Sequence, residues 1–450
     1  MSDGDLPTRS ALPQVNDAPE PDAGTLNNVP DASIPYVAQP SFPNMNGFHQ
    51  VPDPSLANMP LPANGTDPAM FTMPVQPGLS ADEFALYDRQ LRTWGVKVQE
   101  NLRQANVLLI GLKALGTEIA KNLVLAGVGT LTVLDGDVVS EEDLGSQFLV
   151  NESHVGQNRA IAALPALQKL NPRVELYSDP NAAVTKDPEY FQSFDVTIAT
   201  DLLIEVLVHI NMSCRLSGRK FYAANTYGMY GFIFADLFVH DFIVEQEQSN
   251  KPPKVGDMVS STRSVTGISS NKVNGKTTDT VFYQETYSPL QLVNLSPLPV
   301  KVRSTRRSRL RVSPLLSCIR ALFDFQTQSG GRYPVHTQQD LGTFTKLVNE
   351  KHLELQLPTE TLRAEFLRSF LQNLGAEISP VASFLGGFLA QDVINVLGQK
   401  EAPLQNVLLF DGEDFTASQY SIHPINDDAM TAIATNGGHG LPADSSIPAA

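Results

Sequence analysis

Residues 106–135 read NVLLIGLKALGTEIAKNLVLAGVGTLTVLD, and this stretch decides the fold. An apolar run at 106–110 precedes a glycine-containing turn, an amphipathic helix at 117–126, and a second apolar run at 130–134 that ends at Asp135. Strand, glycine turn, helix, strand and acid in this order are typical of a nucleotide-binding βαβ unit. The middle glycine of the fingerprint, between Gly111 and Gly116, is replaced by Lys113.

The rest of the chain extends this alternation of strands and helices. Hydrophobic periodicity predicts strands at 173–178, 194–201, 220–224, 230–237 and 406–411. It predicts helices at 155–170, capped by Ser153, and at 203–217, 314–326, 338–375 and 379–397. Strands and helices at this spacing indicate an α/β fold, a doubly wound, mostly parallel, Rossmann-like sheet.

Five segments are expected along the chain. Residues 1–80 form an acidic, Pro-rich tail and residues 424–450 a small polar one, both expected to be disordered. Residues 81–245 and 376–423 form the α/β domain, interrupted by an insertion at 246–375. The first part of the insertion, 246–278, lacks periodicity and is expected to be a flexible loop, and helices follow it.

Composition excludes several classes of protein. Residues 1–80 hold 15 of the 32 prolines and eight acids against one Arg and no Lys, and the whole chain has a net charge of −16. Such a chain is a poor general binder of nucleic acid, because phosphate binding depends on Lys and Arg. Only two cysteines occur, which argues against a disulfide framework. With no leader and no apolar run of about 18 residues in view, we expect neither secretion nor a membrane span.

Two nucleotide chemistries are compatible with the βαβ unit. A dinucleotide-dependent oxidoreductase would place Asp135, which follows Gly111 by 24 residues, on a ribose. Lys113 argues against it, because it puts a side chain where pyrophosphate needs bare backbone. The alternative is adenylation, in which ATP activates a carboxylate.

The residues around the glycines resemble the ubiquitin-activating, ThiF-like family, over about 82–245 and 375–415. The resemblance is closest to the small, non-catalytic subunits of heterodimeric SUMO-activating enzymes, in which Lys at the middle fingerprint position is usual. The motifs that carry it are YDRQ (87–90), EIAKNLVLAGV (118–128), QFL (147–149), VG (155–156), LNP (170–172), PVA (380–382), GG (386–387) and AQD (390–392).

The resemblance implies that this chain has lost its own ATP site. The active half of such enzymes has an Arg where this chain has Ser146, and a phosphate-contacting Lys where it has Arg159. Asp135 matches the ribose-binding acid and Asp201 the magnesium-binding acid, although either could equally be a helix cap or turn former. Gly111, Lys113, Gly116, Asp135, Arg159 and Asp201 are therefore interpreted as a vestigial site without a bound metal or cofactor of its own.

No cysteine matches the family's nucleophile. Cys214 and Cys318 both lie in apolar stretches and are expected to pack in the core. The resemblance implies that ATP, Mg²⁺ and the catalytic Cys belong to a partner, the catalytic subunit, and that contact with SUMO is indirect. The complex would be a ligase-type enzyme, this chain alone being inactive.

Arg89 is the candidate catalytic residue. The family's inactive half reaches across the dimer, and its Arg at the position of Arg89 contacts ATP held by the active half. The competing interpretation is a surface ion pair between Arg89 or Arg92 and Asp88 or Glu83.

Two functional alternatives remain: the small subunit of the NEDD8-activating enzyme, and a self-sufficient homodimeric adenylating enzyme of the ThiF type. The resemblance implies residence in the nucleus, with the cytoplasm as a second location. Residues 301–311 hold six Lys or Arg in eleven positions, which is compatible with a solvated or acid-paired surface or with a nuclear-import patch.

Overall fold

The structure is a computed structural model that describes residues 78–247, 252–273 and 276–424. The chain divides into two units, Met1–Met73 and Pro74–Ala450, and all described residues belong to the second. The two tails of the sequence analysis lie outside the described residues, apart from residues 78–80 and Pro424.

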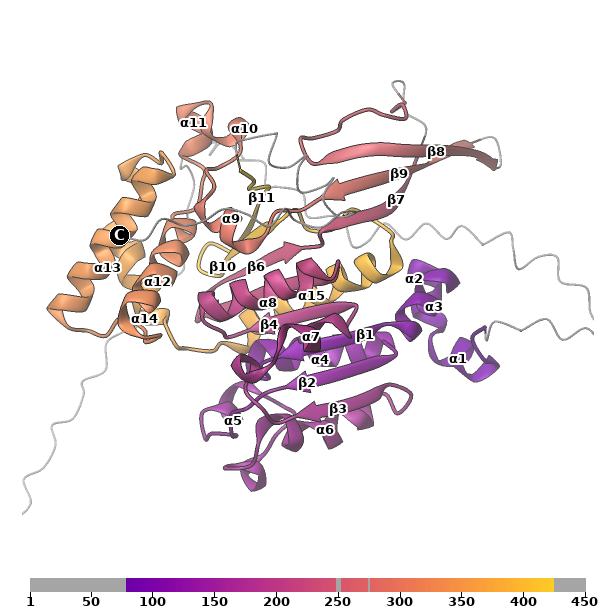
Figure 1. Cartoon of the computed structure of the whole chain (residues 1–450), viewed down its shortest axis with the longest axis horizontal. Helices are drawn as coiled ribbons and strands as arrows, with labels where there is room; N and C mark the ends of the chain where they lie inside the picture. Colours follow the sequence, from indigo (N-terminus) through magenta and orange to yellow (C-terminus); the bar gives the residue numbers. More distant parts are fainter. Residues whose placement is uncertain (1–77, 248–251, 274–275, 425–450) are drawn as a thin grey trace, which may run out of the picture. The chain divides into compact units, whose positions relative to one another are not determined.

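An eight-stranded sheet forms the centre of this unit, in the order β11-β10-β6-β5-β4-β1-β2-β3 (Figure 1). Its parallel strands are β1 (Asn106–Ile110), β2 (Thr130–Leu134), β3 (Glu175–Asp179), β4 (Val196–Thr200) and β5 (Lys220–Tyr227). Its antiparallel end consists of β6 (Tyr230–Asp236), β10 (Val407–Asp411) and β11 (Thr416–Tyr420). The predicted α/β, mostly parallel, Rossmann-like fold is confirmed.

Helices cover both faces of the sheet. Val107 and Leu109 of β1 point into one core, and Leu108 and Ile110 into the other, as the alternation of side chains along a strand requires. The first core is covered by α3 (Val96–Gln104), α4 (Ala114–Ala126), α6 (Arg159–Leu170) and α15 (Ser379–Gly398). The second is covered by α7 (Pro188–Gln192), α8 (Ile204–Leu216), α9 (Leu290–Leu295), α12 (Leu315–Ser329), α13 (Gln338–Glu354) and α14 (Ala364–Asn373).

Short helices complete the described elements. They are α1 (Ala81–Leu86), α2 (Asp88–Trp94), α5 (Asp143–Ser146), α10 (Val300–Arg303) and α11 (Arg306–Arg309), with 3-10 turns η2 (Glu152–His154), η3 (Ala183–Thr185) and η4 (Thr359–Thr361). The predicted start of the helix at 155–170 was wrong. Asn158, whose side chain accepts a hydrogen bond from Ile161 N at 3.1 Å, caps α6, whereas Ser153 lies in η2.

The flexible loop predicted at 246–278 is also wrong. The described residues there contribute to a separate antiparallel sheet of β7 (Val239–Glu247), β9 (Lys276–Thr286) and β8 (Arg263–Val273), in that order. Backbone pairing holds these strands while few of their side chains are buried, so hydrophobic periodicity does not reveal them. The Asn-Gly pair at 274–275 in the sequence is a hairpin signal that periodicity overlooks.

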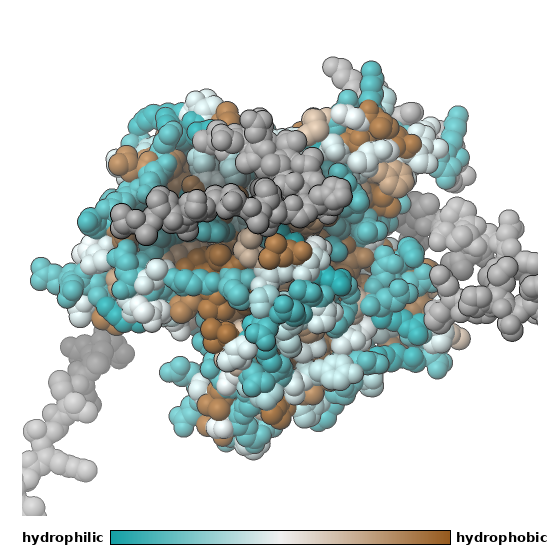
Figure 2. All heavy atoms as spheres, in the orientation of Figure 1, coloured by the Kyte–Doolittle hydropathy of each residue, from teal (hydrophilic) through white to brown (hydrophobic). Residues whose placement is uncertain are grey.

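Apolar and polar side chains mix on the surface around this small sheet. Apolar atoms gather at the upper right of Figure 2, where Figure 1 places β7 to β9. The connection that precedes β8 exposes 64% of Met258 and 56% of Val259. Apolar residues in this part of the chain thus follow no regular period, and hydrophobic periodicity predicts no strand from them.

Helix α15 is a core element of the first face. Within the described residues it is the one helix long and apolar enough to cross a membrane, so the expectation that the chain has no apolar run of about 18 residues was wrong. Of its most apolar 18-residue window, 61% is buried in the protein. It packs against α4 and α3, and Gly386 lets it approach α4 closely, because a Cβ there would lie 2.7 Å from Glu118 Cβ.

Adjacent glycines in α15 provide a test of this packing. We expect Gly386→Ala to lower the free energy of unfolding by about 1–3 kcal/mol, because the new methyl group overlaps Glu118. Gly387→Ala is the matched control, since its nearest atom would be 4.0 Å away and Ala favours a helix by about 1 kcal/mol. Urea unfolding followed by circular dichroism measures both; equal effects would contradict the close approach.

Candidate nucleotide site

The glycine turn after β1 is retained for reasons of packing. Gly111 has a φ of +83°, and a Cβ there would lie 2.6 Å from the carbonyl oxygen of Thr200 at the end of β4. A Cβ at Gly116 would lie 2.0 Å from the carbonyl oxygen of Gly111. Side chains at these positions would collide with backbone, so the fold itself requires both glycines, whether or not a nucleotide binds.

Asp135, the candidate ribose-binding acid, faces the protein. It is 5% exposed at the end of β2. Its carboxylate accepts hydrogen bonds from the backbone N–H of Leu112 at 2.8 Å and of Asp137 at 2.9 Å, and from Nη1 of Arg159 at 2.8 Å. Both carboxylate oxygens are thus engaged by the chain itself.

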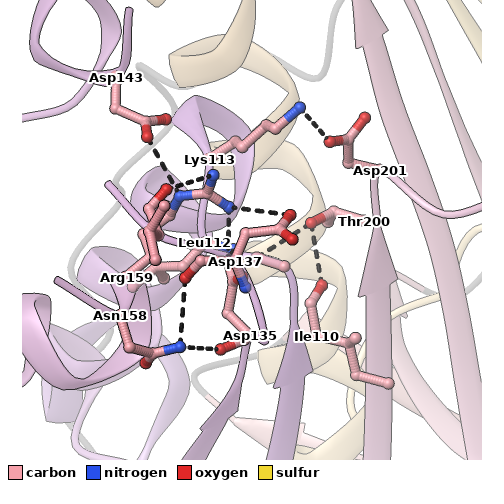
Figure 3. Close-up of polar contacts among 12 residues, drawn as sticks. Ile110, Leu112, Lys113, Asp135, Asp137, Asp143, Asn158, Arg159, Thr200 and Asp201 are labelled. Carbon is pink, nitrogen blue, oxygen red and sulfur yellow. Dashed lines mark hydrogen bonds and ion pairs between the residues drawn. The ribbon is translucent and has the colours of Figure 1, made fainter. Parts of the chain in front are cut away.

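Arg159, the candidate phosphate contact, lies between two acids at the start of α6. Nη1 donates to Asp135 and Nε donates to Asp143 at 3.3 Å, and the side chain is only 6% exposed (Figure 3). Burial alone would lower the pKa of this guanidinium, but the charges of Asp135 and Asp143 outweigh it and raise the pKa. Arg159 is therefore a buried structural cation in this structure.

Lys113 neutralises the candidate magnesium acid. Its Nζ lies 2.5 Å from Oδ2 of Asp201, which follows β4 with a φ of +56° (Figure 3). Burial would lower the pKa of Lys113, but Asp201 offsets it and raises the pKa. Lys113, which replaces the middle glycine, thus forms an ion pair with the carboxylate that would bind a magnesium ion.

Glu377 is a member of this cluster that the sequence analysis missed. Its carboxylate accepts hydrogen bonds from the backbone N–H of Ala114, the first residue of α4, at 3.3 Å and from Oγ of Ser146 at 2.8 Å. The N-terminus of a helix is a natural binding place for phosphate. Here an internal carboxylate, whose pKa burial raises, takes that place. No local signal marks Glu377, because its partners lie more than 200 residues earlier in the chain.

Ion pairs and hydrogen bonds within the chain engage every charged side chain of the cluster. The structure brings together all six residues of the predicted site, and adds Asp143, Ser146 and Glu377. Binding Mg²⁺ and a nucleotide would require breaking the ion pairs of Arg159 and Lys113 and displacing Glu377 from α4. These residues do not fit a nucleotide site in this arrangement.

Neither cysteine is placed as a nucleophile. Cys214 on α8 and Cys318 on α12 are fully buried in the second core. Burial raises the pKa of the Cys214 thiol to about 12, and it raises the pKa of Cys318 as well. A thiolate is therefore disfavoured at both positions near neutral pH.

Arg89 lies exposed on α2. The ion pairs that could have engaged it are formed by other residues: Arg92 with Asp88 at 2.9 Å, and Arg103 with Glu83 at 3.3 Å. Within the part of the chain that the structure describes, Arg89 makes no ion pair.

A surface hollow begins next to Arg89. Gln90 and Trp94 of α2 line it on one side, and α4 and α15 contribute Leu125 and Gly387 among others. The cavity has a volume of about 230 Å³, and Leu125 is 44% exposed beside it. The hollow next to α2 is thus lined by apolar side chains and by amide side chains.

Arg159 tests the buried charge cluster. We expect Arg159→Ala to lower the free energy of unfolding by about 3–5 kcal/mol, because it leaves Asp135 and Asp143 buried without a cation. Arg92→Ala, which removes an exposed ion pair, should cost less than about 1 kcal/mol. Urea unfolding of each variant gives the values, and a small loss for Arg159→Ala would contradict the structural role.

Comparison with known proteins identifies the family of the chain. Residues 87–430 match the ThiF family. The chain is 39% identical over 339 residues to the DNA damage tolerance protein RHC31 of Saccharomyces cerevisiae, covering 74% of this chain and 95% of that relative. It is 33% identical over 341 residues to SUMO-activating enzyme subunit 1 of Xenopus laevis and 32% identical over 336 residues to that of Homo sapiens, in each case covering 74% of this chain and 94% of the relative. The chain therefore belongs to the ThiF family and, within it, is a relative of SUMO-activating enzyme subunit 1.

Proposed function

We propose that this chain is the small, non-catalytic subunit of a heterodimeric SUMO-activating enzyme. The observation that carries the proposal is the similarity to SUMO-activating enzyme subunit 1 over 94% of the relatives' length, together with a candidate nucleotide site whose two cations are paired with acids of the same chain. The catalytic partner would hold ATP and Mg²⁺, adenylate the C-terminus of SUMO and form the thioester.

The chemistry of this chain supports a division of labour. Adenylation needs cations on the phosphates and a carboxylate for magnesium. In this chain Arg159 is committed to buried acids, and Asp201 is committed to Lys113. Thioester formation needs a reactive thiol, and both cysteines are buried. Each of these requirements has to be met by another subunit.

Arg89 is the proposed chemical contribution of this chain. An arginine supplied from a neighbouring subunit stabilises charge that develops on phosphate, because its planar fork can donate two hydrogen bonds to phosphate oxygens. The exposure of Arg89 and its freedom from ion pairs in the described residues support this role.

The hollow between α2, α4 and α15 is the proposed place of pairing. It adjoins the helix that carries Arg89, and it exposes Leu125 beside the small residue Gly387. A partner surface seated there would lie next to α2, so that binding the partner and presenting Arg89 would occur together.

The remaining alternatives are less well supported. The similarity to SUMO-activating enzyme subunit 1 favours SUMO over NEDD8. A self-sufficient homodimeric enzyme or a dinucleotide-dependent oxidoreductase would need an open site where Lys113 and Glu377 now lie. Nuclear residence is part of the proposal and rests on the resemblance alone.

The role of Arg89 can be tested in the assembled heterodimer. We expect Arg89→Ala to lower SUMO-dependent ATP–pyrophosphate exchange by about tenfold or more, because one charge-assisted contact of roughly 1.5–3 kcal/mol is lost. Arg92→Ala on the same helix is the control and should leave exchange unchanged. Both variants should still assemble with the catalytic subunit. Exchange that survives Arg89→Ala would remove the trans role, and exchange by the unpaired chain would remove the non-catalytic assignment.

The pairing surface has its own test. We expect Leu125→Arg to weaken assembly with the catalytic subunit at least tenfold, because a charge would be buried against the partner without a counterion. Leu216→Arg is the control: Leu216 is 75% exposed at the end of α8, on the other face of the sheet. Analytical ultracentrifugation of equimolar mixtures measures both, and equal assembly would exclude this hollow as the interface.

A further inference from the structure

The basic run at 301–311 is folded. It forms α10 and α11, two short helices separated by Ser304 and Thr305, and the Thr305 side chain caps α11 by accepting a hydrogen bond from Ser308 N at 3.1 Å. Figure 1 places both helices beside β11, away from the candidate nucleotide site. The run is therefore a folded, helical part of the domain surface and not an extended basic peptide.

Most of these cations have no counterion among the described residues. Arg306 pairs with Glu360, whereas Lys301, Arg303, Arg307, Arg309 and Arg311 make no ion pair with the described residues. Nε of Arg303 and Nε of Arg309 are buried without a hydrogen-bond partner there. Five like charges within eleven residues repel one another, so an anion among them would relieve an unfavourable field.

Three of these five cations line one cavity. Lys301, Arg307 and Arg311 line a space of about 580 Å³ together with Ser308 and Tyr420, and none of the lining residues is acidic. Burial raises the pKa of Tyr420, which keeps its phenol protonated. That hydroxyl accepts a hydrogen bond from Ser313 N at 3.3 Å, so its own proton can be donated into the cavity.

We propose that this cavity, here named the α10–α11 basic cavity, binds a compact ligand that carries phosphate groups. Arg presents planar pairs of N–H donors that match phosphate oxygens, and the cavity combines two such residues with a Lys and two hydroxyls. Long nucleic acid is disfavoured, because it would extend from a confined patch onto a protein with a net charge of −16. The phosphate could belong to a free polyphosphate or to a phosphorylated side chain.

Calorimetric titration of the full chain with inorganic tripolyphosphate tests the site. We expect saturable binding that weakens as salt concentration rises. The double substitution Arg307→Ala with Arg311→Ala should weaken it at least tenfold, because two charge-assisted contacts are lost. Arg306→Ala is the matched control: it removes an arginine of the same helix that pairs with Glu360 and does not line the cavity, so affinity should change less than twofold.

Further titrations identify the source of the phosphate. A phosphoserine peptide that competes with tripolyphosphate, while its unphosphorylated form does not, indicates a phosphorylated protein; tripolyphosphate binding without such competition indicates a free polyphosphate. Three results would overturn the proposal. They are the absence of saturable tripolyphosphate binding, an equal loss of affinity in the double variant and in Arg306→Ala, and tighter binding of a single-stranded oligonucleotide than of tripolyphosphate. Matching circular dichroism spectra ensure that the variants are folded.

Discussion

The buried guanidinium of Arg159 links the end of β2, helix α5 and the start of α6, and the structure of the candidate nucleotide site depends on these contacts. It bonds Asp135 at the end of β2 and Asp143 on α5, while its own backbone begins α6. A buried charge that loses its partner is costly, so these three segments depend on one another. The same contact engages one cation and one acid of the candidate nucleotide site within the chain, so a single set of ion pairs links the stability of the domain to the state of that site.

Two neighbouring contacts engage other groups of the candidate site in the same way. Lys113 holds Asp201, and Glu377 occupies the N-terminus of α4, where a phosphate would otherwise be favoured. Gly111 and Gly116 are kept because a Cβ would strike backbone, which is a requirement of the βαβ unit and not of a ligand. The exposed cations discussed above lie elsewhere on the surface: Arg89 on α2 and the cations that line the α10–α11 basic cavity.

Local patterns predicted the central fold well. The strands at 106–110 and 130–134 agree with the structure residue for residue, because both are short apolar runs bounded by turns. Periodicity failed for β8 and β9, whose stability comes from pairing across a hairpin while many of their side chains stay exposed. The sequence analysis also assigned the cap of α6 to Ser153 in place of Asn158. Both residue types are good N-caps, and only the backbone conformation, with Ser153 inside η2, shows which of them begins the helix.

The sequence by itself determined the family, the βαβ unit, and the replacement of the residues that would serve ATP at 113, 146 and 159. Those substitutions are visible because each falls inside a short motif of fixed spacing. Only the tertiary structure decided what the substituted residues do. Lys113 meets Asp201 from another strand, and Glu377 reaches α4 from 263 residues away, a contact that the fold creates and that no local pattern contains. Electrostatic neutralisation acts through space, so it becomes visible only when distant segments are brought within hydrogen-bond distance.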